Sequence, residues 1–211
     1  MVNGLKSLLD FLFPQNTRDK TISNLTPEML AEKFALFEND EIFSFFPYED
    51  ELIKHMIWKL KYRGDKRMAE LFSESIADVF MEELGEHALL NGFENPLLIP
   101  IPLSRGRLRE RGYNQAHIFA RALKEAIPSF GTVTHDVLLK IRETPPQTSL
   151  TREERNVNLK GAFLVRNRSA VRSKDILLVD DITTTGSTLR EARKTLERAG
   201  ARSVISLTIA H

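Results

Sequence analysis

The 211-residue chain contains no cysteine. Disulfide bonds, thiolate catalysis and cysteine-ligated zinc or iron–sulfur sites are therefore excluded. No apolar run approaches the roughly 20 residues that a membrane span needs. The short apolar stretch before Pro14 is interrupted by Asp10 and is followed by no small-residue cleavage site. We therefore expect a cytoplasmic protein without a membrane span or a signal peptide.

The whole chain lacks a strong excess of either charge, because its formal net charge is only +1. Its two halves, however, are strongly and oppositely charged. Residues 1–99 carry 10 Lys and Arg against 18 Asp and Glu, whereas residues 100–211 carry 20 against 11. The net charges of the two parts are therefore −8 and +9. An acidic helical surface explains the first value, and an anionic ligand, either a phosphate-rich small molecule or nucleic acid, explains the second.

The first part of the chain has a helical pattern. Residues 1–48 resemble an irregular, helix-containing appendage in which Thr26 and Pro27 are typical of a helix start. Apolar residues at helical spacing predict helices over residues 49–62 and about 66–84, separated by a break around Gly64.

From residue 97 onward, short apolar runs alternate with amphipathic segments. Helices are predicted from about residue 114 and over 186–199. The apolar runs that predict strands are 97–99, 137–141, 176–179 and 204–209. This alternation predicts an α/β domain with a mostly parallel sheet flanked by helices. Ligands of such sheets bind at the carboxyl ends of the strands, so we look for chemistry in the loops after residues 99, 141 and 179.

The loop at residues 180–188 has the sequence Asp-Asp-Ile-Thr-Thr-Thr-Gly-Ser-Thr. Backbone N–H groups, Thr and Ser hydroxyls and a helix N-terminus can together hold a phosphate, and Gly186 lets the main chain approach it. Asp180 and Asp181 repel each other unless they accept hydrogen bonds from a diol or face a magnesium ion. A sugar phosphate offers both groups. A strand followed by an Asp turn and a helix cap explains only part of the pattern, and a Walker-type site is excluded because no Gly-Lys-Ser/Thr follows.

Two further loops are rich in arginine. Arginines at positions 105, 107, 109 and 111 alternate along a stretch that we expect to be extended or turning. Their spread suits a pyrophosphate or a nucleic-acid backbone. The loop after residue 141 begins with a polar stretch containing Pro145-Pro146, which suits a mobile lid over an anionic substrate. A solvated surface is the alternative interpretation of both loops.

The 180–188 stretch closely resembles the phosphoribosyl pyrophosphate signature of the type I phosphoribosyltransferases. The resemblance implies that Asp180 and Asp181 bind the ribose hydroxyls and, with Arg105, form the catalytic set. Mg²⁺ would arrive with the substrate near the two carboxylates, with no direct protein ligand. The residues implied to hold the 5′-phosphate are Thr184, Thr185, Gly186, Ser187 and Thr188, and those implied to hold the pyrophosphate are Leu103, Ser104 and Arg105. The implied flexible loop contains Arg142, Thr144, Gln147, Arg152 and Arg155.

Several segments together resemble the ComF family, bacterial phosphoribosyltransferase-like proteins associated with DNA uptake in competence. Three of the matching segments are Leu60-Lys-Tyr-Arg-Gly-Asp65, Arg109-Glu-Arg-Gly-Tyr-Asn-Gln-Ala116 and Thr144-Pro-Pro-Gln147. The resemblance implies a type I phosphoribosyltransferase fold over residues 49–211, preceded by a small, mainly helical appendage over residues 1–48.

The chain departs from the family pattern at its N-terminus. Family members usually carry two Cys-x-x-Cys pairs, typical of a zinc ribbon, after a Phe-Pro that corresponds to Phe13-Pro14. This chain has no cysteine, so we expect no zinc. The appendage would then be held by apolar packing through Leu25, Leu30, Phe34, Phe37 and the aromatic cluster at residues 43–48.

Three functions stay open. The first is magnesium-dependent transfer of a phosphoribosyl group to an unknown acceptor, driven by electrostatics, because no nucleophile or dedicated general base is evident. The second is a non-catalytic module that senses a phosphoribosyl ligand or nucleotide and acts through DNA-uptake proteins or single-stranded DNA. The third is purine or orotate salvage, for which no base-recognition element is evident in residues 1–62 or after residue 205. The sequence also leaves open whether the protein forms an oligomer.

Overall fold

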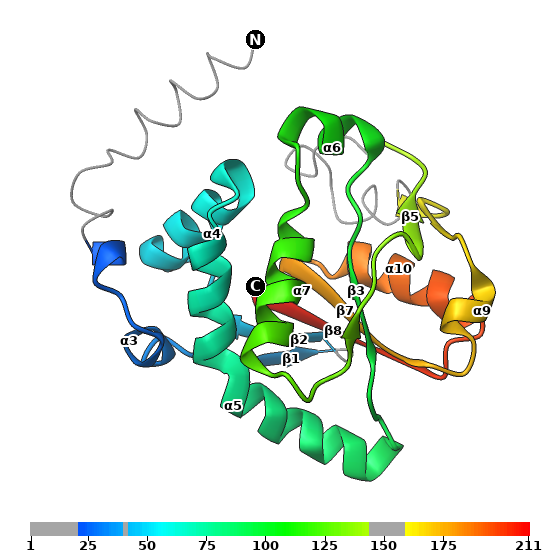
Figure 1. The fold of residues 1–211 in the computed structure, drawn as a ribbon, viewed down its shortest axis with the longest axis horizontal. Helices are drawn as coiled ribbons and strands as arrows, with labels where there is room; N and C mark the ends of the chain where they lie inside the picture. The colour runs from blue at the N-terminus through cyan, green and yellow to red at the C-terminus, as the bar shows by residue number, and fades with distance from the viewer. Residues whose placement is uncertain (1–20, 40–41, 144–158) are drawn as a thin grey trace.

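The computed structural model describes residues 21–39, 42–143 and 159–211 (Figure 1). Its main sheet has six strands in the order β1-β2-β8-β7-β3-β4, and every neighbouring pair is parallel except β1–β2. The strands of this sheet are β1 (Phe37–Asn39), β2 (Ile42–Phe46), β3 (Leu97–Pro100), β4 (Thr132–Val133), β7 (Asp175–Ile182) and β8 (Ser203–Ala210). The helices are α3 (Pro27–Ala31), α4 (Glu51–Arg63), α5 (Lys66–Asn91), α6 (Arg105–Arg111), α7 (Gln115–Ala126), α9 (Arg168–Val171) and α10 (Ser187–Arg198).

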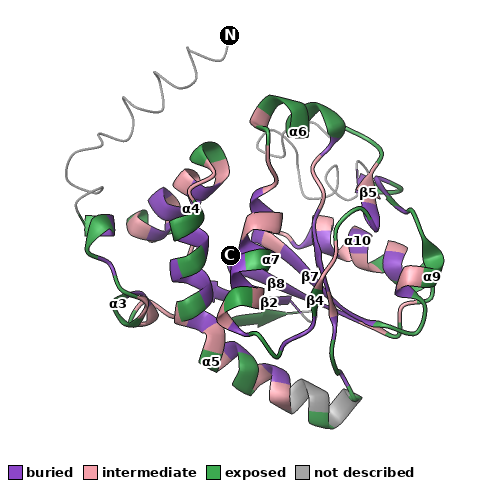
Figure 2. Cartoon of the chain, viewed as in Figure 1, coloured by how far each residue is buried: buried purple, intermediate pink, exposed green. Residues whose placement is uncertain are grey.

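Helices cover both faces of the sheet. On one face, α5 and α7 pack over a core that includes Phe72 and Phe119. On the other face, α10 packs against β8 over a second core that includes Leu189 and Leu196. The side chains of β7 alternate between the two cores, and Figure 2 shows this strand buried along most of its length. A strand covered on both faces is expected at the centre of a parallel sheet. The predicted α/β fold, with a mostly parallel sheet flanked by helices, is confirmed.

Capping residues set the ends of the predicted helices. Oδ1 of Asp50 accepts hydrogen bonds from the N–H groups of Leu52 at 2.8 Å and Ile53 at 3.1 Å, and so begins α4. Gly64, at φ 62°, ends this helix. Thr26 caps α3, as predicted. The helix after Gly64 is longer than predicted and runs to residue 91.

Strands β1 and β2 join the main sheet, although the sequence assigned their residues to an appendage ending at residue 48. Strand β2 pairs in parallel with β8, in a register that joins Ile42 to Ser206 and Phe46 to Ala210. All five residues of β2 are buried. The expected apolar packing of Leu25, Leu30 and Phe34 occurs in the core that contains Phe72 and Phe119, whereas Phe37, also expected there, is exposed and stacks on His211. The partner strand lies far away in the sequence, so no local pattern could indicate this pairing. The domain division at residue 48 stays a prediction.

Two further segments differ from the sequence predictions. The strand predicted at residues 137–141 is β5 (Leu138–Lys140), which pairs antiparallel with β6 (Phe163–Val165) in a separate two-stranded sheet. The arginine-rich stretch is the helix α6 and not an extended loop. Ser104 caps this helix, because its Oγ accepts a hydrogen bond from the N–H of Arg107 at 3.4 Å, and Gly112 ends it at φ 82°.

None of the helices in the described residues is both long and apolar enough to cross a membrane.

Candidate functional site

Strand β7 carries Asp180 and Asp181 to the carboxyl end of the sheet. Asp181 is 5% exposed, whereas Asp180 keeps part of its surface accessible. The N–H of Asp181 donates a hydrogen bond to Oδ1 of Asp180 at 2.9 Å. Nε2 of Gln115 donates to Oδ1 of Asp181 at 3.3 Å. Oδ2 of Asp181 is buried and has no hydrogen-bond partner among the described residues.

Burial and nearby charges change the pKa of Asp180. Desolvation and repulsion from Asp181 raise the pKa of Asp180 well above its ordinary value, and the positive charge of Lys61 opposes this rise. Desolvation and the charge of Arg107 lower the pKa of Lys140, while Asp180 acts in the opposite direction. Lys61 on α4 and Lys140 on β5 therefore both act electrostatically on Asp180.

The loop that follows forms a small cradle of about 40 Å³, lined by Asp180 and residues 182–189. Gly186 is the N-cap of α10 at φ 70° and makes no side-chain cap hydrogen bond. The hydroxyls of Thr185 and Ser187 lie 2.8 Å apart and share a hydrogen bond. The guanidinium of Arg190 donates to the carbonyl oxygen of Thr185. A helix N-terminus, two hydroxyls and a guanidinium at one place suit a phosphate group.

Glycine is required at the N-cap of α10 for two reasons. Its φ of 70° lies in the left-handed region, which L-residues with a side chain rarely adopt. In addition, a Cβ at Gly186 would lie 2.6 Å from Nη1 of Arg190 and 3.0 Å from Cδ1 of Ile42. The backbone of the cradle is therefore packed closely against β2 and against the side chain of its own helix.

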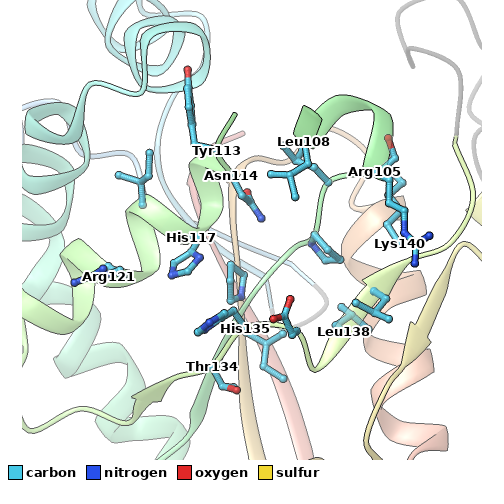
Figure 3. Close-up of a pocket in the computed structure, with 18 of the residues that line it drawn as sticks. Arg105, Leu108, Tyr113, Asn114, His117, Arg121, Thr134, His135, Leu138 and Lys140 are labelled. Carbon is cyan, nitrogen blue, oxygen red and sulfur yellow. The ribbon is translucent and has the colours of Figure 1, made fainter. Parts of the chain in front are cut away.

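The loop after β3 carries the other predicted anion-binding residues. Ser104 is 4% exposed and caps α6, and Arg105 is exposed at the first position of that helix. Leu103, Ser104 and Arg105 line a cavity of about 1040 Å³, separate from the cradle (Figure 3). Arg142 lines the same cavity, and its Nη1 donates to the carbonyl oxygen of Lys160 at 3.2 Å.

The structure divides the predicted site residues into two groups. Asp180 and the residues from Thr184 to Thr188 line the cradle, whereas Leu103 to Arg105 and Arg142 line the larger cavity. Lys140 links the two groups, because it lines the larger cavity and interacts electrostatically with Asp180. The other predicted lid residues lie outside the described residues, and these are Thr144, Gln147, Arg152 and Arg155.

Sequence reasoning missed three polar residues around Asp180 and Asp181. Nη1 of Arg111, one of the predicted anion-binding arginines, donates to Oε1 of Gln115 at 2.6 Å, and Gln115 in turn contacts Asp181, so that α6, α7 and β7 are joined by one chain of hydrogen bonds. Lys61 and Gln115 lie within segments that carry the family resemblance, which was the available signal. Lys140 lies in a predicted strand, where an isolated lysine gives no such signal.

Tyr113 holds the end of α4 beside this site. The hydroxyl of Tyr113 donates to the carbonyl oxygen of Lys61 at 3.1 Å. The ring of Tyr113 lies against Gly64, where a Cβ would be 3.0 Å from ring carbons. The end of α4 is thereby held against the α6–α7 connection, which keeps Lys61 close to the carboxylates.

Comparisons with known proteins identify the family of this chain. Residues 109–211 match the family model described as the phosphoribosyl transferase domain. The chain is 30% identical over 181 residues to competence protein ComFC of Bacillus subtilis, a match that covers 85% of this chain and 67% of that protein. It is 34% identical over 110 residues to competence protein F of Haemophilus influenzae, covering 51% of this chain and 46% of that protein.

A third relative carries a different name. DNA utilization protein YhgH of Escherichia coli K12 is 29% identical over 150 residues, covering 71% of this chain and 63% of that protein. The matches thus span between about half and two thirds of the length of these relatives. The domain match and the observed sheet confirm the expected type I phosphoribosyltransferase fold. We conclude that this chain belongs to the ComF competence family and contains a phosphoribosyltransferase-like domain.

Proposed function

We propose that the protein binds phosphoribosyl pyrophosphate, or a nucleoside monophosphate, and transfers the phosphoribosyl group between pyrophosphate and a nitrogenous acceptor. One observation carries the proposal. Asp180 and residues 182–189 line one cradle at the N-terminus of α10, and the neighbouring carboxylate of Asp181 is buried with one oxygen that has no hydrogen-bond partner among the described residues. A diol acceptor and a phosphate cradle on one loop are what a ribose 5-phosphate requires.

In this proposal the carboxylates orient the sugar. Asp180 and Asp181 accept hydrogen bonds from the two ribose hydroxyls, while the residues from Thr184 to Thr188 hold the 5′-phosphate. The anomeric C–O bond breaks with its electron pair leaving on pyrophosphate, and the acceptor nitrogen forms the new bond to the anomeric carbon. Arg105 and Lys140 stabilise the departing negative charge. Fixed charges and positioning would supply the rate enhancement.

Magnesium fits the donor set at this site. The carboxylate oxygens of Asp180 and Asp181 are hard ligands of the kind that Mg²⁺ prefers, and one of them is buried without a hydrogen-bond partner among the described residues. Mg²⁺ bound together with the substrate would neutralise charge on the pyrophosphate. The substrate would lie between the metal and the two aspartates, so neither aspartate would bind the metal directly.

Calorimetric titration with phosphoribosyl pyrophosphate and Mg²⁺ tests the binding step. Asp181→Ala should weaken binding by roughly tenfold or more, because it removes a charged hydrogen-bond acceptor. Asp78→Ala, at an exposed carboxyl on α5, is the matched control and should leave binding unchanged. Absence of binding to the unaltered protein would refute the proposal.

Pyrophosphate release with a panel of purine, pyrimidine and other nitrogenous acceptors tests the chemical step. Turnover of a purine or of orotate would identify a salvage enzyme. Binding without turnover of any acceptor would refute transfer and would leave the sensing module as the function.

A direct role in handling single-stranded DNA is the second candidate. Helix α6 carries four arginines in seven residues, and three of them are exposed. The relatives named for competence and DNA utilization also support it, and they support DNA-uptake proteins as partners. Binding of single-stranded DNA should fall steeply with added salt and should weaken in an Arg107→Ala, Arg109→Ala double variant. Salt-independent or absent binding would refute direct contact.

A further inference from the structure

The 1040 Å³ cavity extends well beyond the residues that the proposed function uses. It runs from the loop after β3 along α7 to the connection between β4 and β5 (Figure 3). Such a volume is at the upper end of the range for small-molecule sites, which combine apolar walls with a few polar groups. Here Ile118 and Leu138 contribute apolar wall, and polar side chains gather at two ends.

The end of the cavity beside α6 is cationic. Arg105, Lys140 and Arg142 line it, and the carboxylate of Glu143, which accepts a hydrogen bond from Ser104, is the acidic group at this end. The pKa of Lys140 is lowered by desolvation and by the charge of Arg107, so positive groups crowd one another here. An anion at this end would relieve that repulsion and gain charge-assisted hydrogen bonds. Several phosphate oxygens would suit the end better than a single carboxylate.

The other end is nearly neutral and suits a heterocycle. The rings of His117 on α7 and His135 after β4 have centroids 5.2 Å apart and a tilt of 32°. Burial and the neighbouring His135 and Arg121 lower the pKa of His117, while Asp136 opposes them. A neutral imidazole offers one hydrogen-bond donor and one acceptor. Asp136 and Glu125 add carboxylate acceptors for amino groups and disfavour a phosphate at this end.

We propose that this cavity is a second ligand site, which takes a nucleoside diphosphate with its phosphates at Arg105 and Lys140 and its base against the rings of His117 and His135. The site shares the loop after β3 with the phosphoribosyl pyrophosphate site, and in that respect the inference rests on the proposed function. Because the two ligands need the same cations, they exclude each other. The nucleotide would therefore act as a competitive inhibitor of phosphoribosyl pyrophosphate binding.

Titration calorimetry with ADP, GDP, ribose 5-phosphate and phosphoribosyl pyrophosphate on the full chain tests this site. His135→Ala and His117→Ala should each raise the Kd of a bound nucleoside diphosphate by about five- to tenfold. Neither variant should change the Kd of phosphoribosyl pyrophosphate or of ribose 5-phosphate, which lack a base. His211→Ala is the matched control, because His211 stacks on Phe37 at 4.2 Å and does not line the cavity. Circular dichroism establishes that each variant is folded.

The outcomes separate the inference from the function on which it rests. A nucleotide that binds, competes with phosphoribosyl pyrophosphate and is weakened by both histidine variants supports the second site. The second site is refuted, with the proposed function intact, when phosphoribosyl pyrophosphate binds and neither nucleotide does. The second site is also refuted when the Kd of the nucleotide is unchanged in both histidine variants, or when bound nucleotide does not weaken the binding of phosphoribosyl pyrophosphate. Failure of every ligand to bind refutes both proposals.

Discussion

Oγ of Ser104 donates a hydrogen bond of 3.4 Å to Oε1 of Glu143. The carboxylate lies so close to Gly106 that a side chain at that position would collide with it. Ser104 belongs to the segment predicted to bind pyrophosphate, so in this structure a carboxylate of the chain itself lies where we expect an anionic substrate. Binding of pyrophosphate would then require Glu143 to move.

Glu143→Gln should strengthen binding of pyrophosphate and of phosphoribosyl pyrophosphate by about three- to tenfold. The Glu143 carboxylate competes with the anionic substrate for Ser104 and repels it, whereas a neutral amide repels it much less and is a weaker competitor. Calorimetry on the two proteins measures the change. Glu110→Gln, at an exposed carboxylate on α6, serves as the control and should have a smaller effect. Equal Kd values for the unaltered protein and the Glu143 variant would contradict the competition.

Asp180→Asn should stabilise the ligand-free protein increasingly as the pH rises. Because the folded-state pKa of Asp180 is raised, the folded state holds its proton longer than the unfolded state does. Stability is therefore lost as the pH rises from the ordinary carboxyl range, about pH 4, toward the raised pKa. The asparagine variant cannot ionise and avoids this loss. Urea unfolding at about pH 4.5 and about pH 7 should show a larger gain at the higher pH, and a gain independent of pH would contradict the raised pKa.

Gly186→Ala should both destabilise the protein and weaken phosphate binding. The left-handed backbone costs about 1–2 kcal/mol for a residue with a Cβ, and the new methyl group would press on Arg190 and Ile42. Thermal unfolding and the Kd of ribose 5-phosphate measure the two effects. Gly85→Ala is the control, because Gly85 lies within α5 and a methyl group added there would meet nothing within 4 Å. That change should be neutral or slightly stabilising.

Asp175→Ala should cost about 1–3 kcal/mol of unfolding free energy, because it leaves the N–H of Glu94 without its acceptor and removes the hydrogen bonds to Arg202, whose side chain is 54% exposed. Oδ1 of Asp175 accepts a hydrogen bond from Nε of Arg202 at 2.7 Å, and its Oδ2 accepts one from the N–H of Glu94 at 2.7 Å. Asp175 is 3% exposed, so water cannot replace these partners. Urea unfolding measures the loss.

A matched surface pair provides the comparison for Asp175. Glu197→Ala breaks the i, i+4 pair with Arg193 on α10, whose atoms lie 2.8 Å apart. That change should cost less than about 0.5 kcal/mol. Similar losses in the two variants would contradict a structural role for the buried pair.

The sequence alone determined the local features of this protein. The N-cap at Thr26, the helix start near residue 114 and the break at Gly64 all depend on residues close together in the sequence, and the structure has each of them where it was expected. The 180–188 motif is likewise contiguous, although its first three residues belong to β7. The family resemblance also rests on contiguous motifs. The roles of the cradle residues stay predictions until a ligand is measured.

Only the tertiary structure decided which distant residues meet. The pairing of β2 with β8, the hydrogen bond from Gln115 to Asp181 and the approach of Lys61 and Lys140 to Asp180 all join segments that are 40 or more residues apart. Such contacts depend on how the two faces of the sheet are covered, and periodicity carries no information about which strand or helix lies next to which. The 180–188 loop could therefore be found from the sequence, whereas the charges that set the pKa of Asp180 could not.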